Sequence, residues 1–167
     1  MLGLAQAQME ASPTTLYAMV GESCQGACRF CAQARDSDAD RKFLSRIAWP
    51  AYPLAEVTSA LSRPHPLRRI CLQTLLTPQL LPALLESVTQ LHAVSPLPIS
   101  VCLNPIPREG LEALKAAGVE RVGVGLDCAT EALFEELKPG FSWERTQRFL
   151  EDVAAVSRRP IGPQTDL

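Results

Sequence analysis

Aromatic residues are scarce in this chain, at 5% of 167 residues, and neither sign of charge is in large excess. Lys and Arg number 16 against 18 Asp and Glu, and the formal net charge of −2 gives no electrostatic basis for binding nucleic acid or an anionic membrane surface. No apolar run approaches the roughly 20 residues that span a bilayer. The stretch from Met1 to Ala11 has no basic start and carries Glu10, so it is a poor signal peptide. We therefore expect a cytoplasmic protein without nucleic-acid or membrane partners.

Acid–base motifs are missing as well. The two histidines, His65 and His92, stand alone, and neither a Ser-His-Asp set nor a carboxylate pair is evident. Cysteine, by contrast, occurs six times. In a reducing compartment, clustered cysteines indicate metal binding or catalysis before they indicate disulfides. The cysteines are therefore the first candidates for function.

Apolar strands alternate with amphipathic helices along the chain. We expect strands over 14–20, 69–74, 99–103 and 121–127. We expect a first helix that begins at residue 53 or 54, and further helices over 78–93, 109–117, 131–137 and 143–156. Gly118 predicts the end of the third helix, because glycine is favoured just after a helix C-terminus. Near-continuous apolar strands in this alternation predict a parallel α/β fold. Without a dinucleotide-binding glycine fingerprint, a barrel-like arrangement is favoured over a Rossmann sheet.

The alternation stops after about four β/α units. Pro160, Gly162 and Pro163 make the last residues of the chain a poor fifth strand. We therefore expect one partial-barrel domain over 14–167, preceded by an extension over 1–13, and interpret the chain as the N-terminal part of a larger barrel. Its open parallel edge predicts self-association or a partner chain that completes the barrel.

Cys24, Cys28 and Cys31 have the spacing C-x3-C-x2-C directly after the first predicted strand. An iron–sulfur cubane is held by thiolates that converge from one short segment, and Gly26 lets the backbone curl around it. Three cysteines leave one iron without a protein ligand, open to the amino and carboxylate groups of S-adenosylmethionine (SAM). A structural zinc site is the alternative, but zinc normally takes four ligands in paired sets, and nothing nearby in the sequence suggests a fourth.

With Phe30 before the third cysteine, this motif resembles that of the radical SAM superfamily, C-x3-C-x-φ-C with φ aromatic. The resemblance implies an enzyme that binds a [4Fe–4S] cluster through Cys24, Cys28 and Cys31 and cleaves SAM to a 5′-deoxyadenosyl radical. It also implies that Phe30 lies near the adenine. A one-electron donor such as flavodoxin or ferredoxin is the expected partner.

Finer features resemble biotin synthases. Residues 31–35 are similar to the segment after the third cysteine of that family, which implies a cofactor contact by Gln33. Cys71 and Cys102 stand at strand positions where the family's cysteines bind an auxiliary iron–sulfur cluster, the sulfur donor. Leu126-Asp127 resembles a fourth-strand motif whose carboxylate binds the ribose hydroxyls of SAM. Together these features imply sulfur insertion, as in biotin or lipoyl formation, at an unactivated C–H bond of a small-molecule or carrier-bound substrate.

These residues also have structural interpretations. Cys71 and Cys102 stand in apolar strands, where cysteine packs as a small hydrophobe, and Asp127 could cap the following helix. Gly125 replaces the asparagine of biotin synthases, so sulfur insertion need not mean biotin formation. Cys128 has no counterpart in the family pattern and is expected only to pack. Two alternatives to a complete enzyme stay open: a catalytically incomplete iron–sulfur fragment or subunit, and a zinc-stabilised structural module.

Overall fold

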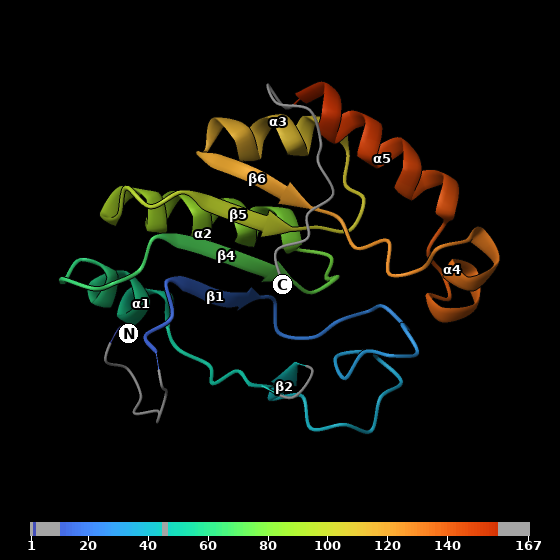
Figure 1. Cartoon of the computed structure of the whole chain (residues 1–167), viewed down its shortest axis with the longest axis horizontal. Helices are drawn as coiled ribbons and strands as arrows, with labels where there is room; N and C mark the ends of the chain where they lie inside the picture. The colour runs from blue at the N-terminus through green and yellow to red at the C-terminus, as the bar shows by residue number, and fades with distance from the viewer. Residues whose placement is uncertain (1, 3–10, 45–46, 157–167) are drawn as a thin grey trace.

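Four parallel strands form the central sheet. In the computed structural model, which describes residues 2, 11–44 and 47–156, they lie in the order β1-β4-β5-β6. These strands are β1 (Thr15–Val20), β4 (Arg69–Thr74), β5 (Ile99–Cys102) and β6 (Val119–Gly123). The helices that alternate with them are α1 (Leu54–Leu61), α2 (Leu80–Val94) and α3 (Arg108–Ala116), and α4 (Glu131–Leu137) and α5 (Trp143–Val156) follow. All four arrowheads point the same way in Figure 1, toward α4 and the long loop after β1.

The two faces of the sheet differ. Ile70 and Leu72 of β4 are 0% and 1% exposed and belong to the core beneath the helices. Cys71 and Gln73 alternate with them and are half-buried on the other face, because successive side chains of a strand point to opposite faces. Tyr17, the β1 partner of Cys71, is 54% exposed. The strands therefore bury one face against the helices and present thiol and polar side chains on the other.

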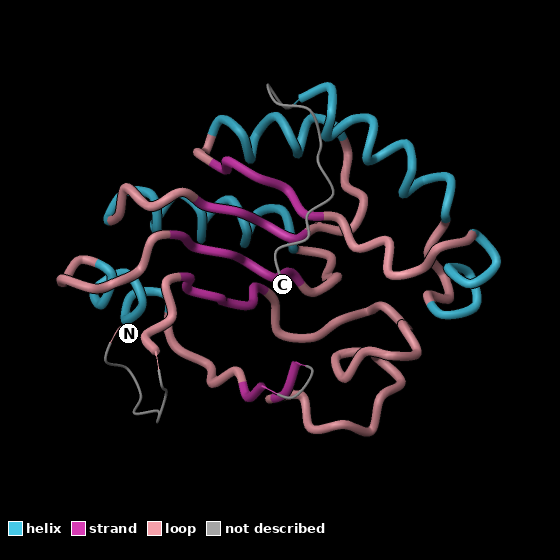
Figure 2. The backbone as a smooth tube through the Cα atoms, viewed as in Figure 1, coloured by secondary structure: helices cyan, strands magenta, loops and turns pink. Residues whose placement is uncertain are grey.

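Helix α2 supplies much of the helical side of the core. Leu84, Val88 and Leu91, at helical spacing, are 0%, 0% and 2% exposed. Full burial of such side chains stabilises the fold by roughly 1.5–3 kcal/mol each. The long loop after β1 runs past the carboxyl end of that strand, apart from this core (Figure 2).

The predicted helices are found nearly as expected, and α4 and α5 have the predicted bounds. Gly118 follows α3 with φ of +105°, in the predicted terminating role. The fourth strand ends at Gly123, earlier than predicted. Asp127, predicted to be its last residue, has φ of 61°, a conformation that regular strands do not adopt. The sequence does not predict the antiparallel hairpin of β2 (Phe43–Leu44) and β3 (Ile47–Ala48), because two-residue strands carry no readable alternation.

The division into an extension over 1–13 and a domain over 14–167 stays a prediction. The segment 160–167, predicted to be a poor strand, lies outside the described residues. Within the described part of the chain, no helix is both long and apolar enough to cross a membrane.

Candidate metal and cofactor site

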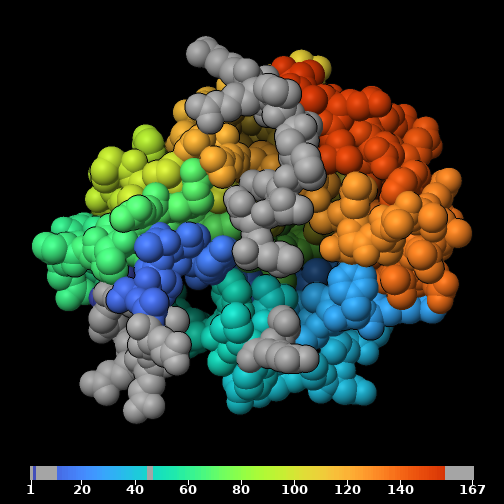
Figure 3. Space-filling view, in the orientation of Figure 1, coloured from blue at the N-terminus to red at the C-terminus, as the bar shows by residue number. Residues whose placement is uncertain are grey.

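The three closely spaced cysteines lie in the loop that follows β1. Cys24, Cys28 and Cys31 are free and half-buried. Gly21, with φ of +114°, turns the chain out of β1, and a Cβ at this position would lie 3.0 Å from Cβ of Leu75. In Figure 3 the loop (blue) lies between the segment that contains β2 (teal) and the segment that contains α4 (orange). The loop therefore stands at the carboxyl end of the parallel sheet, where barrel folds gather their ligands.

Gly26 brings the backbone of this loop close to the thiol of Cys24. Its amide nitrogen donates to Cys24 Sγ at 3.3 Å, and a Cβ on Gly26 would lie 3.4 Å from the same sulfur. That Cβ would also lie 3.3 Å from the ring of Phe141. The amide of Arg35 donates to the Gly26 carbonyl at 2.8 Å and closes the loop. Because an N–H group that donates to sulfur stabilises its charged or metal-bound form, this cradle fits a thiolate-ligated group.

Two backbone hydrogen bonds hold the loop from opposite sides. The amide of Gln25 donates to the Leu76 carbonyl at 2.8 Å, in the segment after β4. The amide of Arg29 donates to the Leu137 carbonyl at 2.9 Å, at the end of α4. The positions of the cysteines are thus fixed by two parts of the fold that are distant in sequence.

Cys28 interacts electrostatically with the other residues of the site. Burial raises the pKa of the Cys28 thiol, and the ammonium of Lys138 opposes that increase in pKa. The neighbouring thiols of Cys31 and Cys24 and the carboxylate of Asp127 raise the pKa further. The three cysteines, Asp127 and Lys138 are therefore close enough to interact electrostatically. Metal binding deprotonates coordinating thiols regardless of these shifts.

The donors of this loop suit an iron–sulfur cluster. A cubane binds each cysteine to a different iron and is held by thiolates from closely spaced cysteines. Three free thiols stand in one loop beside the backbone cradle at Gly26. Among the described residues, no three or more His, Cys, Asp or Glu side chains are arranged around one metal ion.

Asp127 lies in the turn after β6 and is paired with a buried lysine. Lys138 Nζ donates to Asp127 Oδ2 at 2.9 Å and to the Gly125 carbonyl at 2.8 Å. The side chain of Lys138 is 6% exposed, whereas that of Asp127 is 40% exposed. The sequence gives no signal for Lys138, because a lysine just after a helix usually belongs to the solvated surface.

The structural alternative for Asp127, a helix cap, is wrong. The side chain of Thr130 caps α4, and its Oγ1 accepts from the Leu133 amide at 3.4 Å. The carboxylate of Asp127 is instead directed to Lys138 and leaves Oδ1 without a hydrogen bond to any described residue. The half-exposed side chain of Asp127 can therefore offer this oxygen to a ligand.

Cys71 and Cys102 are brought together on the half-exposed face of the sheet. Gln73 Nε2 donates to Cys71 Sγ at 3.3 Å and to Cys102 Sγ at 3.2 Å. Gln73 is the register partner of Cys102, so all three side chains share one face. The hydrogen bond from the Cys102 thiol is the main cause that lowers the pKa of Cys71 to about 6, and the same bond raises the pKa of Cys102. The two thiols therefore interact with each other as well as with Gln73, and a second cluster bound by them stays a prediction.

Phe30 and Gln33 differ in their surroundings. Phe30 is 56% exposed, so its ring is accessible. Gln33 is 1% exposed, and its Nε2 donates to the carbonyls of Arg41 and Phe43, each at 2.6 Å. These bonds brace the end of the cysteine loop against β2. Cofactor contacts by Phe30 and Gln33 stay predictions.

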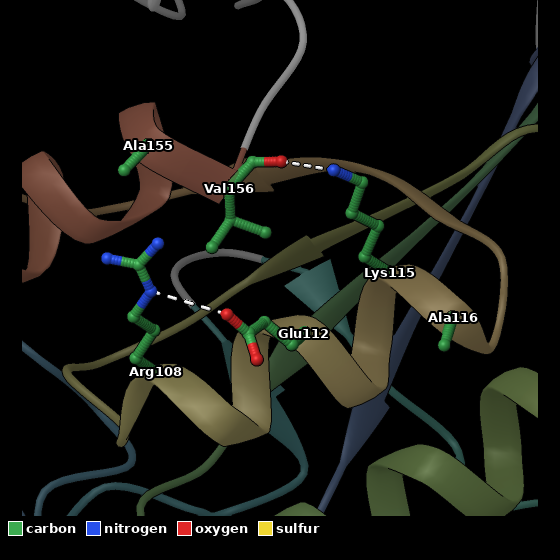
Figure 4. A pocket seen from close by; sticks show the side chains of 6 residues that line it. All are labelled: Arg108, Glu112, Lys115, Ala116, Ala155 and Val156. Carbon is green, nitrogen blue, oxygen red and sulfur yellow. Dashed lines mark hydrogen bonds and ion pairs between the residues drawn. The ribbon is translucent and has the colours of Figure 1, made fainter.

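A pocket of about 410 Å³ lies between α3 and α5, and none of the predicted site residues lines it (Figure 4). The charged side chains that line it already have partners. Arg108 pairs with Glu112 at 3.3 Å, and Lys115 Nζ donates to the Val156 carbonyl. We therefore place the chemistry at the cysteine loop and not in this pocket.

Comparison with known proteins identifies the family and the fold. Residues 19–161 match the radical SAM superfamily. The crystal structure of methylornithine synthase (PylB) is similar, with a TM-score of 0.68 at 14% identity, over 86% of this chain and 42% of that one. The crystal structure of HydG, a maturase of the [FeFe]-hydrogenase, has a TM-score of 0.67 at 13% identity, over 85% of this chain and 32% of that one. No curated protein sequence matches significantly.

This chain therefore spans less than half the length of either solved structure. At such low identities the likeness establishes the fold alone. It confirms the predicted α/β fold, a partial barrel with about four β/α units.

Proposed function

The chain belongs to the radical SAM superfamily, and from that premise we propose that Cys24, Cys28 and Cys31 bind its [4Fe–4S] cluster and that Asp127 binds the ribose of SAM. The superfamily implies both cofactors. When bound, the reduced cluster supplies the electron that cleaves SAM and starts hydrogen-atom abstraction from a substrate. The observation that carries the assignment is one loop that holds three free thiols around the cradle at Gly26.

The residues of the chain bind and orient in this proposal. The three cysteines bind three irons, and one iron remains for the amino and carboxylate groups of SAM. Asp127 accepts hydrogen bonds from the ribose hydroxyls through its half-exposed carboxylate. The exposed ring of Phe30 offers an apolar surface to the adenine. None of these residues needs to act as an acid or base during abstraction.

Sulfur insertion is the finer part of the proposal, and the thiol pair supports it. Cys71 and Cys102 both contact the amide of Gln73 on the sheet face that carries Tyr17, so both thiols are placed to bind a second iron–sulfur cluster on that face. The names of the two similar structures, a methylornithine synthase and a hydrogenase maturase, do not point to sulfur insertion. The substrate is a small or carrier-bound molecule, and a small electron-transfer protein supplies the electron.

A catalytically incomplete iron–sulfur fragment is the second candidate, because the similar chains are more than twice as long as the part matched here. The measurement that separates the two is the formation of 5′-deoxyadenosine from SAM by the anaerobically reconstituted, chemically reduced chain. A catalytic chain forms it, Cys28→Ala abolishes it, and Asp127→Asn reduces it, whereas Cys128→Ala leaves it unchanged. A wild-type chain that binds the iron of the cluster but forms no 5′-deoxyadenosine would support the fragment instead.

The thiol pair has its own readout in the same preparations. If Cys71 and Cys102 hold a second cluster, Cys71→Ser and Cys102→Ser lose part of the iron and keep the share bound by the loop. Iron content unchanged in both variants would remove the auxiliary cluster, and with it the support for sulfur insertion.

A further inference from the structure

Lys138 is a buried cation at the junction of three segments of the site. It follows α4 directly, and its ammonium donates to Asp127 Oδ2 and to the Gly125 carbonyl, both in the turn after β6. The rings of Phe134 and Phe141 flank it, with centroids 4.8 and 5.3 Å from Nζ. The lysine thus connects the turn after β6 with the segment that contacts the cysteine loop.

The burial of this lysine needs a reason. Removing a charge from water costs several kcal/mol, and a buried ion pair is often no more stabilising than apolar side chains of similar volume. The ammonium lies over the ring of Phe134, which is 0% exposed. Because these surroundings are apolar, an apolar side chain at position 138 would suit them as well as lysine does. The chain instead places a charge whose partner, Asp127, is half-exposed. This asymmetry suggests a role in fixing the carboxylate.

We propose that Lys138 is a positioning residue of the cosubstrate site, which holds the Asp127 carboxylate in one orientation and leaves Oδ1 for the ribose hydroxyls of SAM. The inference rests on the proposed role of Asp127. Without Lys138, the carboxylate would rotate freely in a turn that already requires φ of 61°. Ligand binding would then have to order it, which weakens affinity.

Gly125 supplies an independent support. A Cβ at this position would lie 2.9 Å from Asp127 Oδ2, closer than real Cβ contacts allow. Gly125 therefore makes room for the carboxylate in its present orientation, while Lys138 holds it there.

The test uses the full 167-residue chain, reconstituted anaerobically. SAM dissociation constants are measured by calorimetry. We expect Lys138→Met to keep its iron but bind SAM at least tenfold more weakly, and Lys138→Arg to recover part of the affinity. Lys115→Met, a lysine on the exposed surface of α3, is the matched control and should equal the wild type.

The outcomes separate the inference from the proposed function. Wild-type SAM affinity in Lys138→Met would overturn the positioning role and leave the cluster site standing. If Lys138→Met does not fold by circular dichroism, Gly125→Ala decides, because it displaces the same carboxylate with the charge retained. Normal SAM affinity in Gly125→Ala would then refute the inference. A wild type that assembles no cluster would refute the proposed function and, with it, this role of Lys138.

Discussion

The amide of Arg29, in the cysteine loop, donates to the carbonyl of Leu137, at the end of α4, at 2.9 Å. This bond joins the second and third cysteines to a helix that lies far along the chain. The geometry of the thiols therefore depends on the docking of α4 as much as on their own spacing. Changes at this contact should affect metal binding without touching a cysteine.

Gly26→Ala tests the packing of the loop against the segment after α4. Its Cβ would press on the ring of Phe141 at 3.3 Å, and overpacking of this kind costs typically 1–3 kcal/mol. We expect a lower urea midpoint and less iron after reconstitution. The double variant with Phe141→Leu has a smaller side chain at the contact and should recover part of both losses. Equal losses of stability and iron in the single and double variants would show that contact with the Phe141 ring is not the cause.

Gln33→Leu tests the brace between the cysteine loop and β2. The substitution leaves the carbonyls of Arg41 and Phe43 without their donor, and an unsatisfied buried group costs about 1–3 kcal/mol. Urea unfolding of the metal-free chain should show a loss of this size or more. Gln90→Leu is the matched control, because Gln90 is exposed and its side chain bonds to no described residue besides the exposed Glu86, so its change should stay within about 0.5 kcal/mol. Comparable stability of both variants would contradict the brace.

Cys71 should react as a thiolate near neutral pH. Its pKa is lowered to about 6, chiefly by the hydrogen bond from Cys102, so the thiolate is present above that pH and is lost as the pH falls through it. In the metal-free chain, alkylation of Cys71 by iodoacetamide, followed by peptide mass spectrometry, should rise near pH 6 and be nearly level by pH 7.

Cys102→Ala supplies the control for that profile. Removing the Cys102 thiol takes away the main cause of the low pKa, so the alkylation profile of Cys71 should move toward the ordinary thiol range near 8.5. A profile that rises only above pH 8 in both proteins would contradict the lowered pKa of Cys71.

Features with a local signal could be predicted from the sequence. The apolar spacing of residues 143–156 and the glycine after α3 predict helix positions directly, and the cysteine spacing identifies the loop. The sequence predicts the end of β6 four residues too late, at Asp127 instead of Gly123, because Val124 and Leu126 extend the apolar run beyond the strand. The sequence of β4 also hides which face of the strand is buried, because Cys71 counts as apolar although its side chain faces away from the core.

Features made by the tertiary fold could not be predicted. Lys138 is buried only because Phe134, Phe141 and Asp127 meet around it. Gln33 was predicted to contact a cofactor from resemblance alone, and its hydrogen bonds to β2 depend on a hairpin that has no sequence signal. The approach of Cys71 to Cys102 follows from the parallel register, which no single strand encodes.

The central claim is that Cys24, Cys28 and Cys31 hold one [4Fe–4S] cluster. Its most direct test is the iron, sulfide and zinc content of the anaerobically reconstituted chain, compared with Cys24→Ala, Cys28→Ala, Cys31→Ala and the control Cys128→Ala. We predict about four irons per chain from this site, with matching sulfide, lost in each of the first three variants and retained in the control. A colourless protein that holds zinc or no metal, or iron that survives Cys28→Ala, would contradict the claim.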